Sequence, residues 1–146
     1  MTANAGDAVL LYGTAIAWHG RGILLRGPSG AGKSDLALRV IAAGGMLVAD
    51  DQVLATNTKA GVIAAAPPEI AGLIELRGAG LVRLPYLSSA RLALVFDLVP
   101  LGTPERLPEL GRTMIAGAFL PSGVVAPFES SAVEKIVAVL RAHPDF

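Results

Sequence analysis

Residues 27–34 of the chain read Gly27-Pro28-Ser29-Gly30-Ala31-Gly32-Lys33-Ser34, which matches the pattern G-x-x-x-x-G-K-[ST] in full. Glycines let successive backbone N–H groups turn inward on a polyanion, because a Cβ atom would block that curvature. The lysine of such a loop reaches the β- and γ-phosphates, and the hydroxyl of its last residue can bind Mg²⁺. The motif therefore predicts a site for a nucleoside triphosphate and Mg²⁺, with Lys33 on the phosphates and Ser34 on the metal.

The sequence on both sides of this loop provides the strand–loop–helix context that the motif requires. An apolar run precedes it at Ile23-Leu24-Leu25, and a helical pattern follows from Lys33 to Ala43, ending at Gly44-Gly45. Further short strands are expected at residues 8–11, 14–18, 46–49, 53–56, 62–65, 81–84 and 92–96. Residues 99–111 are predicted to be a loop. A final helix is expected, with Ser131 and Glu134 as a capping box.

Composition limits the classes of protein that fit. The chain has 146 residues, the length of one domain, and no cysteine, which excludes disulfides and Cys-ligated metals. Its 12 basic and 12 acidic residues give a net charge of zero, so a nucleic-acid partner is not expected. Hydrophobic residues reach 53% and charged ones only 16%, against a usual figure of about 25%. This excess indicates either a buried oligomer interface or simply an alanine-rich chain.

No membrane segment or secretory leader is expected. The least charged stretch, residues 114–128, contains Pro121, Gly123 and Pro127 and is a poor spanning helix. The N-terminus has no basic region before its first acid, Asp7. These features favour a cytoplasmic protein.

Two adjacent acids, Asp50 and Asp51, follow the apolar stretch 46–49, one helix after the loop. In a parallel sheet the carboxyl ends of adjacent strands meet at the ligand crevice, so we expect both acids to face the γ-phosphate. One carboxylate can hold Mg²⁺, directly or through water, and the other can take a proton from an attacking hydroxyl. The alternative is a turn or helix cap with two solvated acids.

A third motif, residues 75–80, reads Glu75-Leu76-Arg77-Gly78-Ala79-Gly80. Alternation puts Glu75 and Arg77 on the same side if the segment is extended, and the glycines permit close backbone approach. Glu75 could then complete a metal site, and Arg77 could stabilise phosphoryl charge. A surface ion pair beside a turn explains the same spacing equally well.

The three motifs, in this order and at these spacings, resemble the catalytic domain of HPr kinase/phosphorylase. The resemblance covers about residues 11–98 and the closing helix, and the chain looks like the short, catalytic-domain-only form of alphaproteobacteria. It implies one domain over residues 1–146 with an α/β fold: a P-loop-containing mixed β-sheet with flanking helices, akin to phosphoenolpyruvate carboxykinase. It also implies a homo-hexamer that uses ATP and Mg²⁺ to phosphorylate a serine of the carrier protein HPr. In the reverse reaction, inorganic phosphate attacks the phosphoserine.

The resemblance also implies roles for individual residues. Asp50 would be the general base for the seryl hydroxyl and the general acid in the reverse reaction. Asp51, Ser34 and Glu75 would lie at or near Mg²⁺. The implied catalytic residues are Lys33, Asp50 and Arg77.

Two features depart from the family pattern. Tyr12 stands where the family usually has a histidine, and a phenol cannot replace an imidazole as a proton partner near neutral pH. This departure bears on proton handling and on the phosphorylase direction. The family's arginine-rich C-terminal loop is not evident, which leaves Arg106 and Arg112 as weak candidates for its role.

Two other functions remain open on the sequence. A P-loop kinase of a small metabolite would use the same loop and would place the acids against the acceptor hydroxyl. A nucleotide-binding regulator that has lost catalysis is the other alternative, and Tyr12 is the feature that favours it.

Overall fold

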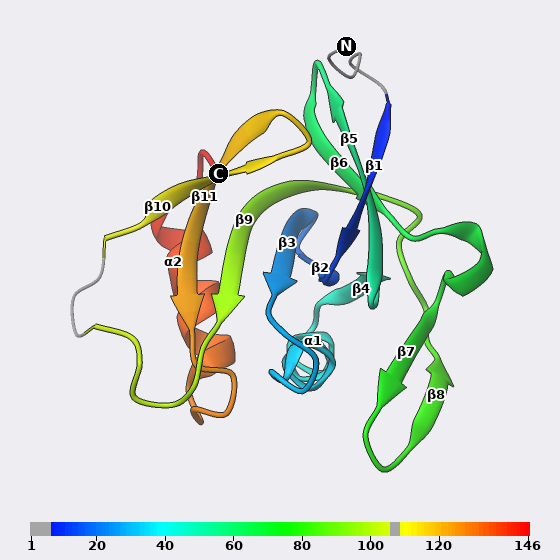
Figure 1. Cartoon of the computed structure of the whole chain (residues 1–146). Coiled ribbons are helices and arrows are strands. Elements are labelled where there is room, and N and C mark those ends of the chain that lie inside the picture. The colour runs from blue at the N-terminus through cyan, green and yellow to red at the C-terminus, as the bar shows by residue number, and fades with distance from the viewer. Residues whose placement is uncertain (1–6, 106–108) are drawn as a thin grey trace.

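The structure, a computed structural model, describes residues 7–105 and 109–146. Within these residues the chain forms a nine-stranded mixed sheet, a separate two-stranded sheet and two α-helices (Figure 1). The large sheet contains β1 (Ala8–Tyr12), β2 (Thr14–Trp18), β3 (Arg21–Arg26), β4 (Met46–Ala49), β5 (Gln52–Thr58), β6 (Gly61–Ala65), β9 (Ala90–Leu98), β10 (Gly111–Ile115) and β11 (Ala118–Val125). The other elements are α1 (Lys33–Ala42), a 3₁₀ turn (Pro68–Ile70), β7 (Leu73–Leu76), β8 (Gly80–Arg83) and α2 (Ala132–Ala142).

The long strand β9 joins the parts of the large sheet. β3 runs parallel to β9 along one of its edges. On the opposite edge, the first residues of β9 pair with β6 and its second half pairs in parallel with β11. β3, β9 and β11 therefore end at the same edge of the sheet, and the segments that follow these three strands lie there together (Figure 1).

The strand before the glycine-rich loop (residues 27–34) and the strand before the two acids are not neighbours. β2 lies between β3 and β4 and is antiparallel to both, so the prediction that adjacent parallel strands bring the loop and the acids together is wrong. The cause is the two-residue turn His19-Gly20, where both φ angles are positive, which folds β2 back directly onto β3. Because β3 and β4 nevertheless run in the same direction, their carboxyl ends still lie at one edge.

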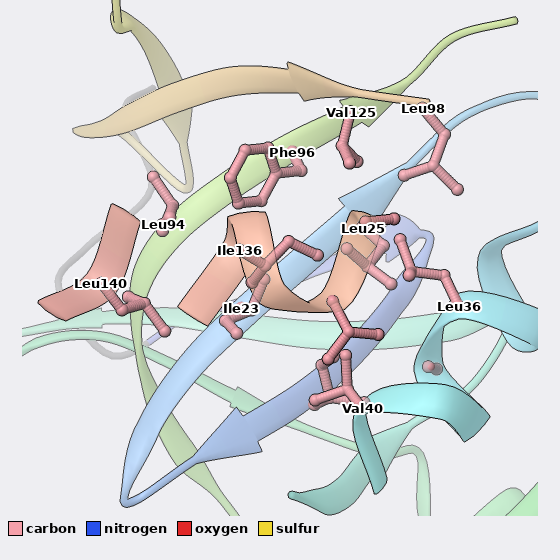
Figure 2. Close-up of a cluster of buried hydrophobic side chains, with 14 of the residues drawn as sticks. Ile23, Leu25, Leu36, Val40, Leu94, Phe96, Leu98, Val125, Ile136 and Leu140 are labelled. Atoms are coloured by element: carbon pink, nitrogen blue, oxygen red, sulfur yellow. The ribbon is translucent and has the colours of Figure 1, made fainter. Parts of the chain in front are cut away.

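The apolar run before the loop is buried on both faces. Ile23 and Leu25 point into a core between the sheet and the two helices, whereas Leu24 points into a second core on the other side. All three side chains are fully buried, as the alternation of a central strand requires. Figure 2 shows the first core, in which the β3 side chains meet Val40 of α1 and Ile136 of α2.

Most predicted elements are present, with four differences, the first of which is β7, a strand that was not predicted. β10 and β11 form a hairpin that the sequence analysis did not predict, and Pro121 and Gly123 lie inside its second strand. The predicted capping box is wrong, because the side chain of the N-cap residue Ser131 makes no capping hydrogen bond. Arg77 belongs to the turn after β7 and not to an extended run. In residues 7–105 and 109–146, no helix has the length and apolar character needed to cross a membrane.

Candidate functional site

A cavity of about 660 Å³ lies at the edge where β3 and β4 end. It gathers the three predicted motifs, although they are far apart in the chain. The predicted residues that line it are Gly27, Ser29, Gly30, Gly32, Lys33, Ser34, Asp50, Asp51, Glu75 and Arg77. Pro28 and Ala31 belong to the same loop but do not line the cavity. The structure thus brings the acids and the arginine to the glycine-rich loop, as predicted.

The loop is shaped to present backbone N–H groups at the start of α1. Gly30 and Gly32 have φ angles of 83° and 102°, in the left-handed region that glycine adopts without strain. Gly32 is the N-cap of α1, and the first N–H groups of a helix have no partner within the helix. These N–H groups and the positive end of the helix dipole favour an anion at this point.

Lys33 lies over the loop with its ammonium group held by the loop itself. Its Nζ donates to the carbonyl oxygens of Gly27, at 2.7 Å, and Pro28, at 3.1 Å. An ammonium group has three N–H donors, so one donor is left for a phosphate oxygen while both of these bonds persist. The lysine is therefore positioned to add a positive charge to the anion site that the helix terminus creates.

Asp50 is buried, only 6% exposed, and its carboxylate accepts three hydrogen bonds. The hydroxyls of Thr14 and Ser34 donate to Oδ1 at 2.9 and 2.8 Å, and the backbone N–H of Glu75 donates to Oδ2 at 3.0 Å. A carboxylate has about four acceptor positions, so Asp50 is nearly saturated. Because the Ser34 hydroxyl donates its hydrogen bond to Asp50, the lone pairs of the Ser34 oxygen are free to face a cation.

Asp51, the next residue, lies in a different environment. Its φ angle of 70° turns the backbone, and its side chain is exposed in the cavity. The turn is held by the N–H of Gly13, which donates to the Asp51 carbonyl at 3.1 Å. Within the described part of the chain, the Asp51 carboxylate has no hydrogen-bond or ion-pair partner. It is therefore the acid of the pair that is free to meet a substrate.

Glu75 and Arg77 reach the cavity from the β7–β8 hairpin, which stands apart from the large sheet (Figure 1). The hairpin is anchored by Ile74, which is fully buried in the core beside α1 and α2. The Glu75 backbone bonds Asp50, while the side chains of Glu75 and Arg77 are exposed. Both charged groups can thus meet a ligand in the cavity without first breaking an internal ion pair.

The oxygen-rich donor set fits a magnesium ion bound together with phosphates. Over residues 7–105 and 109–146, no three His, Cys, Asp or Glu side chains cluster into a ready-made metal site. Mg²⁺ does not require such a cage, because it keeps several waters and is bound by one or two carboxylates plus substrate phosphates. The Ser34 hydroxyl, oriented by Asp50, and the Glu75 carboxylate in the same cavity match that pattern.

Sequence reasoning missed several residues of the site, among them Thr14 and Phe128, and an ion pair that supports it. Thr14 is fully buried and binds Asp50 across 36 positions of sequence, and Phe128 lines the cavity from the segment after β11. Arg26 pairs with Asp97 at the ends of β3 and β9, just before the loop. The sequence carries no local signal for these contacts, because each one depends on how distant strands are arranged.

The other candidates lie elsewhere. Tyr12 lines the cavity and is 72% exposed, so its hydroxyl is open to a ligand. Arg112 stacks over the Phe119 ring on the β10–β11 hairpin, 4.8 Å from its centroid, and does not line the cavity. Arg106 falls outside the described residues.

Comparison with known proteins gives concordant matches. Residues 5–91 match the family model described as HPr Serine kinase C-terminal domain. The chain is 31% identical to an HPr kinase/phosphorylase of Malacoplasma penetrans over 97% of its own length and 52% of that protein. It is 38% identical to one of Clostridium tetani over 63% of its length and 30% of that protein. The chain thus spans about half or less of the length of these curated relatives.

A solved structure gives the same fold. The Hpr(Ser) kinase/phosphatase of Coxiella burnetii superposes with a TM-score of 0.81, covering 93% of this chain and 90% of that one. The sequence identity over this match is 21%. This likeness confirms the mixed α/β fold with its curled sheet.

Proposed function

The chain belongs to the HPr serine kinase C-terminal domain family, and from this premise we propose that it transfers the γ-phosphoryl group of Mg-ATP to a serine hydroxyl of an HPr-like carrier protein. The observation that carries the proposal is the hydrogen-bond network of Asp50. Its carboxylate accepts hydrogen bonds from the Ser34 hydroxyl of the glycine-rich loop, from the Thr14 hydroxyl and from the backbone N–H of Glu75 in the β7–β8 hairpin. The network holds Asp50 in place and leaves the exposed Asp51 carboxylate able to accept the proton of an attacking hydroxyl.

Lys33 and the backbone N–H groups of the loop would bind the β- and γ-phosphates. Arg77 would contact the transferred phosphoryl group from the opposite side of the cavity, because its exposed guanidinium comes from the β7–β8 turn. These contacts would position the γ-phosphorus and offset the negative charge of its oxygens. Positioning and charge are the main contributions that a protein makes to this reaction.

The two adjacent acids would exchange the roles that the resemblance implied for them. Asp50 would orient the Ser34 oxygen towards Mg²⁺ and act as a positioning residue, because its own oxygens are occupied by hydrogen bonds. Asp51 would be the general base, because its carboxylate is exposed in the cavity. When bound, Mg²⁺ supplies positive charge to the β- and γ-phosphate oxygens. Ser34 would be its protein ligand, with Glu75 nearby.

The proposed transfer makes one bond to phosphorus and breaks one in each direction. The serine oxygen of the carrier forms a bond to the γ-phosphorus as the bond to the β–γ bridging oxygen breaks, and ADP leaves. Asp51 takes the hydroxyl proton. In the reverse direction, an oxygen of inorganic phosphate attacks the phosphoserine, Asp51 returns the proton to the serine oxygen, and pyrophosphate is released. Tyr12 lines the same cavity, at the position where the family usually has a histidine.

Other expectations from the resemblance form part of the same proposal. They are a P-loop fold akin to phosphoenolpyruvate carboxykinase, a cytoplasmic location and a homo-hexamer. Exposed apolar side chains on the β10–β11 hairpin, such as Met114 and Phe119, support assembly through apolar surface.

The test is intact-mass spectrometry of the same organism's HPr-like carrier after incubation with this chain and Mg-ATP. We expect one added phosphate with the wild type, none with Lys33→Met, and a loss of at least a hundredfold in rate with Asp51→Asn, in line with the about 10²–10⁴-fold contribution of a general base. Asp145→Asn, an exposed acid near the C-terminus, is the control and should be as active as the wild type.

Other outcomes would favour the alternative functions. ATP turnover stimulated by a small alcohol or sugar, with no phosphate on the carrier, would indicate a metabolite kinase. Tight ATP binding without transfer to any acceptor would indicate a regulator that has lost catalysis. Absence of phosphate on every HPr-like protein, under every metal condition, would overturn the proposal.

A further inference from the structure

Phe128 is an exposed aromatic residue at the rim of the cavity that holds the glycine-rich loop. It lies in the segment between β11 and α2, lines the cavity and is 63% exposed. An aromatic side chain of this size is normally buried, because its exposure leaves a large apolar surface in water. We therefore ask which ligand would cover the exposed face of the ring.

The ring is held against the loop by contacts from two sides. A Cβ atom placed on Gly32 would lie 2.9 Å from the Phe128 Cζ and 3.1 Å from the Pro127 Cγ, so both side chains pack directly on the backbone of Gly32. Arg39 of α1 holds the segment between β11 and α2 in place, because its guanidinium donates to the carbonyl oxygens of Pro127 and Glu129. One end of the ring is thus fixed on the loop while most of the side chain stays exposed.

The sheet topology places Phe128 and the acids on opposite sides of the loop. The loop follows β3, Asp50 follows β4 two strands away on one side, and Phe128 follows β11 two strands away on the other side. A nucleotide whose γ-phosphate faces the acids must extend its other end away from them. The segment after β11 lies in that direction (Figure 1).

We infer that Phe128 is the stacking platform for the base of the nucleotide, with Arg39 as the residue that positions it. This inference rests on the proposed binding of Mg-ATP and adds to it the part of the site that binds the base. Every nucleobase has a flat π-face that stacks on an aromatic ring, so such a platform contributes affinity without reading the edges of the base. It would bind the base and leave the phosphates to the loop.

The test compares two ligands that differ in whether they carry a base. Binding of ADP and of inorganic tripolyphosphate, each with Mg²⁺, is measured by isothermal titration calorimetry on the full chain. Phe128→Leu keeps an apolar side chain against Gly32 but removes the aromatic face, and it should weaken ADP binding about tenfold, within the range of base–aromatic stacking. Tripolyphosphate binding should be unchanged, and Phe128→Tyr should restore ADP binding. Phe146→Leu is the matched control, the same substitution at a phenylalanine that does not line the cavity.

Arg39→Lys gives a second, independent readout, because lysine keeps the charge but lacks the two-pronged guanidinium that holds the segment. It should also weaken ADP and spare tripolyphosphate. An equal loss for both ligands in Phe128→Leu would overturn the inference and would show that the ring only supports the loop. No loss for either ligand would overturn it as well, while the phosphate site would stand. Failure of the wild type to bind either ligand would overturn the proposed function together with the inference.

Discussion

The contrast between Asp50 and Asp51 can be tested by replacing each acid with asparagine, which has almost the same shape. In Asp50→Asn the amide oxygen can keep the hydroxyls of Thr14 and Ser34 at Oδ1, but the amide NH₂ then faces the N–H of Glu75. Leaving that N–H without an acceptor costs about 1–2 kcal/mol, and each hydroxyl bond loses about 1 kcal/mol when its acceptor is no longer charged. The free energy of unfolding should therefore fall by about 3 kcal/mol.

Asp51→Asn should leave stability almost unchanged. The Asp51 carboxylate is exposed, and asparagine tolerates the φ angle of 70° at this position as well as aspartate does. Substitutions of this kind stay within about 0.5 kcal/mol. For a chain of this length, the difference between the two variants corresponds to about 10 °C in Tm, which thermal denaturation followed by circular dichroism resolves easily.

The two variants should also differ in activity. Asp51→Asn should bind ADP like the wild type but transfer phosphate at least a hundredfold more slowly, because only the proton acceptor is lost. Asp50→Asn should bind nucleotide with a weaker dependence on Mg²⁺, because the Ser34 hydroxyl is no longer oriented by a charged acceptor. The reasoning is refuted if Asp51→Asn lowers Tm as much as Asp50→Asn, or if Asp50→Asn leaves both Tm and the Mg²⁺ dependence unchanged.

Three further predictions concern the parts of the fold that support the site. Gly32→Ala should weaken nucleotide binding, because its Cβ would lie 2.9 Å from the Phe128 Cζ and 3.1 Å from the Pro127 Cγ and would force the loop to shift. Gly20→Ala also has a positive φ but has open space around it, so it should bind normally in the same titration. Arg21→Ala should lower the free energy of unfolding, measured in urea, by about 1–2 kcal/mol, because Arg21 donates to the carbonyls of Leu140 and His143 at the end of α2. Recovery of about half of the lost stability in Arg21→Lys would support this. Ile136→Ala, fully buried between α2 and the sheet, should cost about 2–5 kcal/mol in urea, and a loss below 1 kcal/mol would contradict the packing.

The sequence by itself determined the local elements and the loop. The octapeptide 27–34, the buried run of β3 and the pattern of α1 are contiguous signals, so each could be recognised within a few residues. The acids were expected to face the loop from an adjacent parallel strand, an arrangement that the structure does not have, and only the family resemblance placed Glu75 and Arg77 there. The cavity lining nevertheless brings all four residues to the loop. A contiguous motif can be recognised in the sequence because its local geometry is set by neighbouring residues along the chain.

Only the tertiary structure decided which of the two acids has a carboxylate without a hydrogen-bond partner among the described residues, and that Phe128 lies at the site. Asp50 and Asp51 are equivalent in sequence, and a backbone turn at Asp51 together with Thr14, 36 positions away, separates their environments. The same applies to Phe128, which reaches Gly32 only because β11 pairs with β9 and β9 with β3. Hydrogen bonds and packing between residues far apart in sequence depend on strand order, and no local pattern of residue types encodes that order.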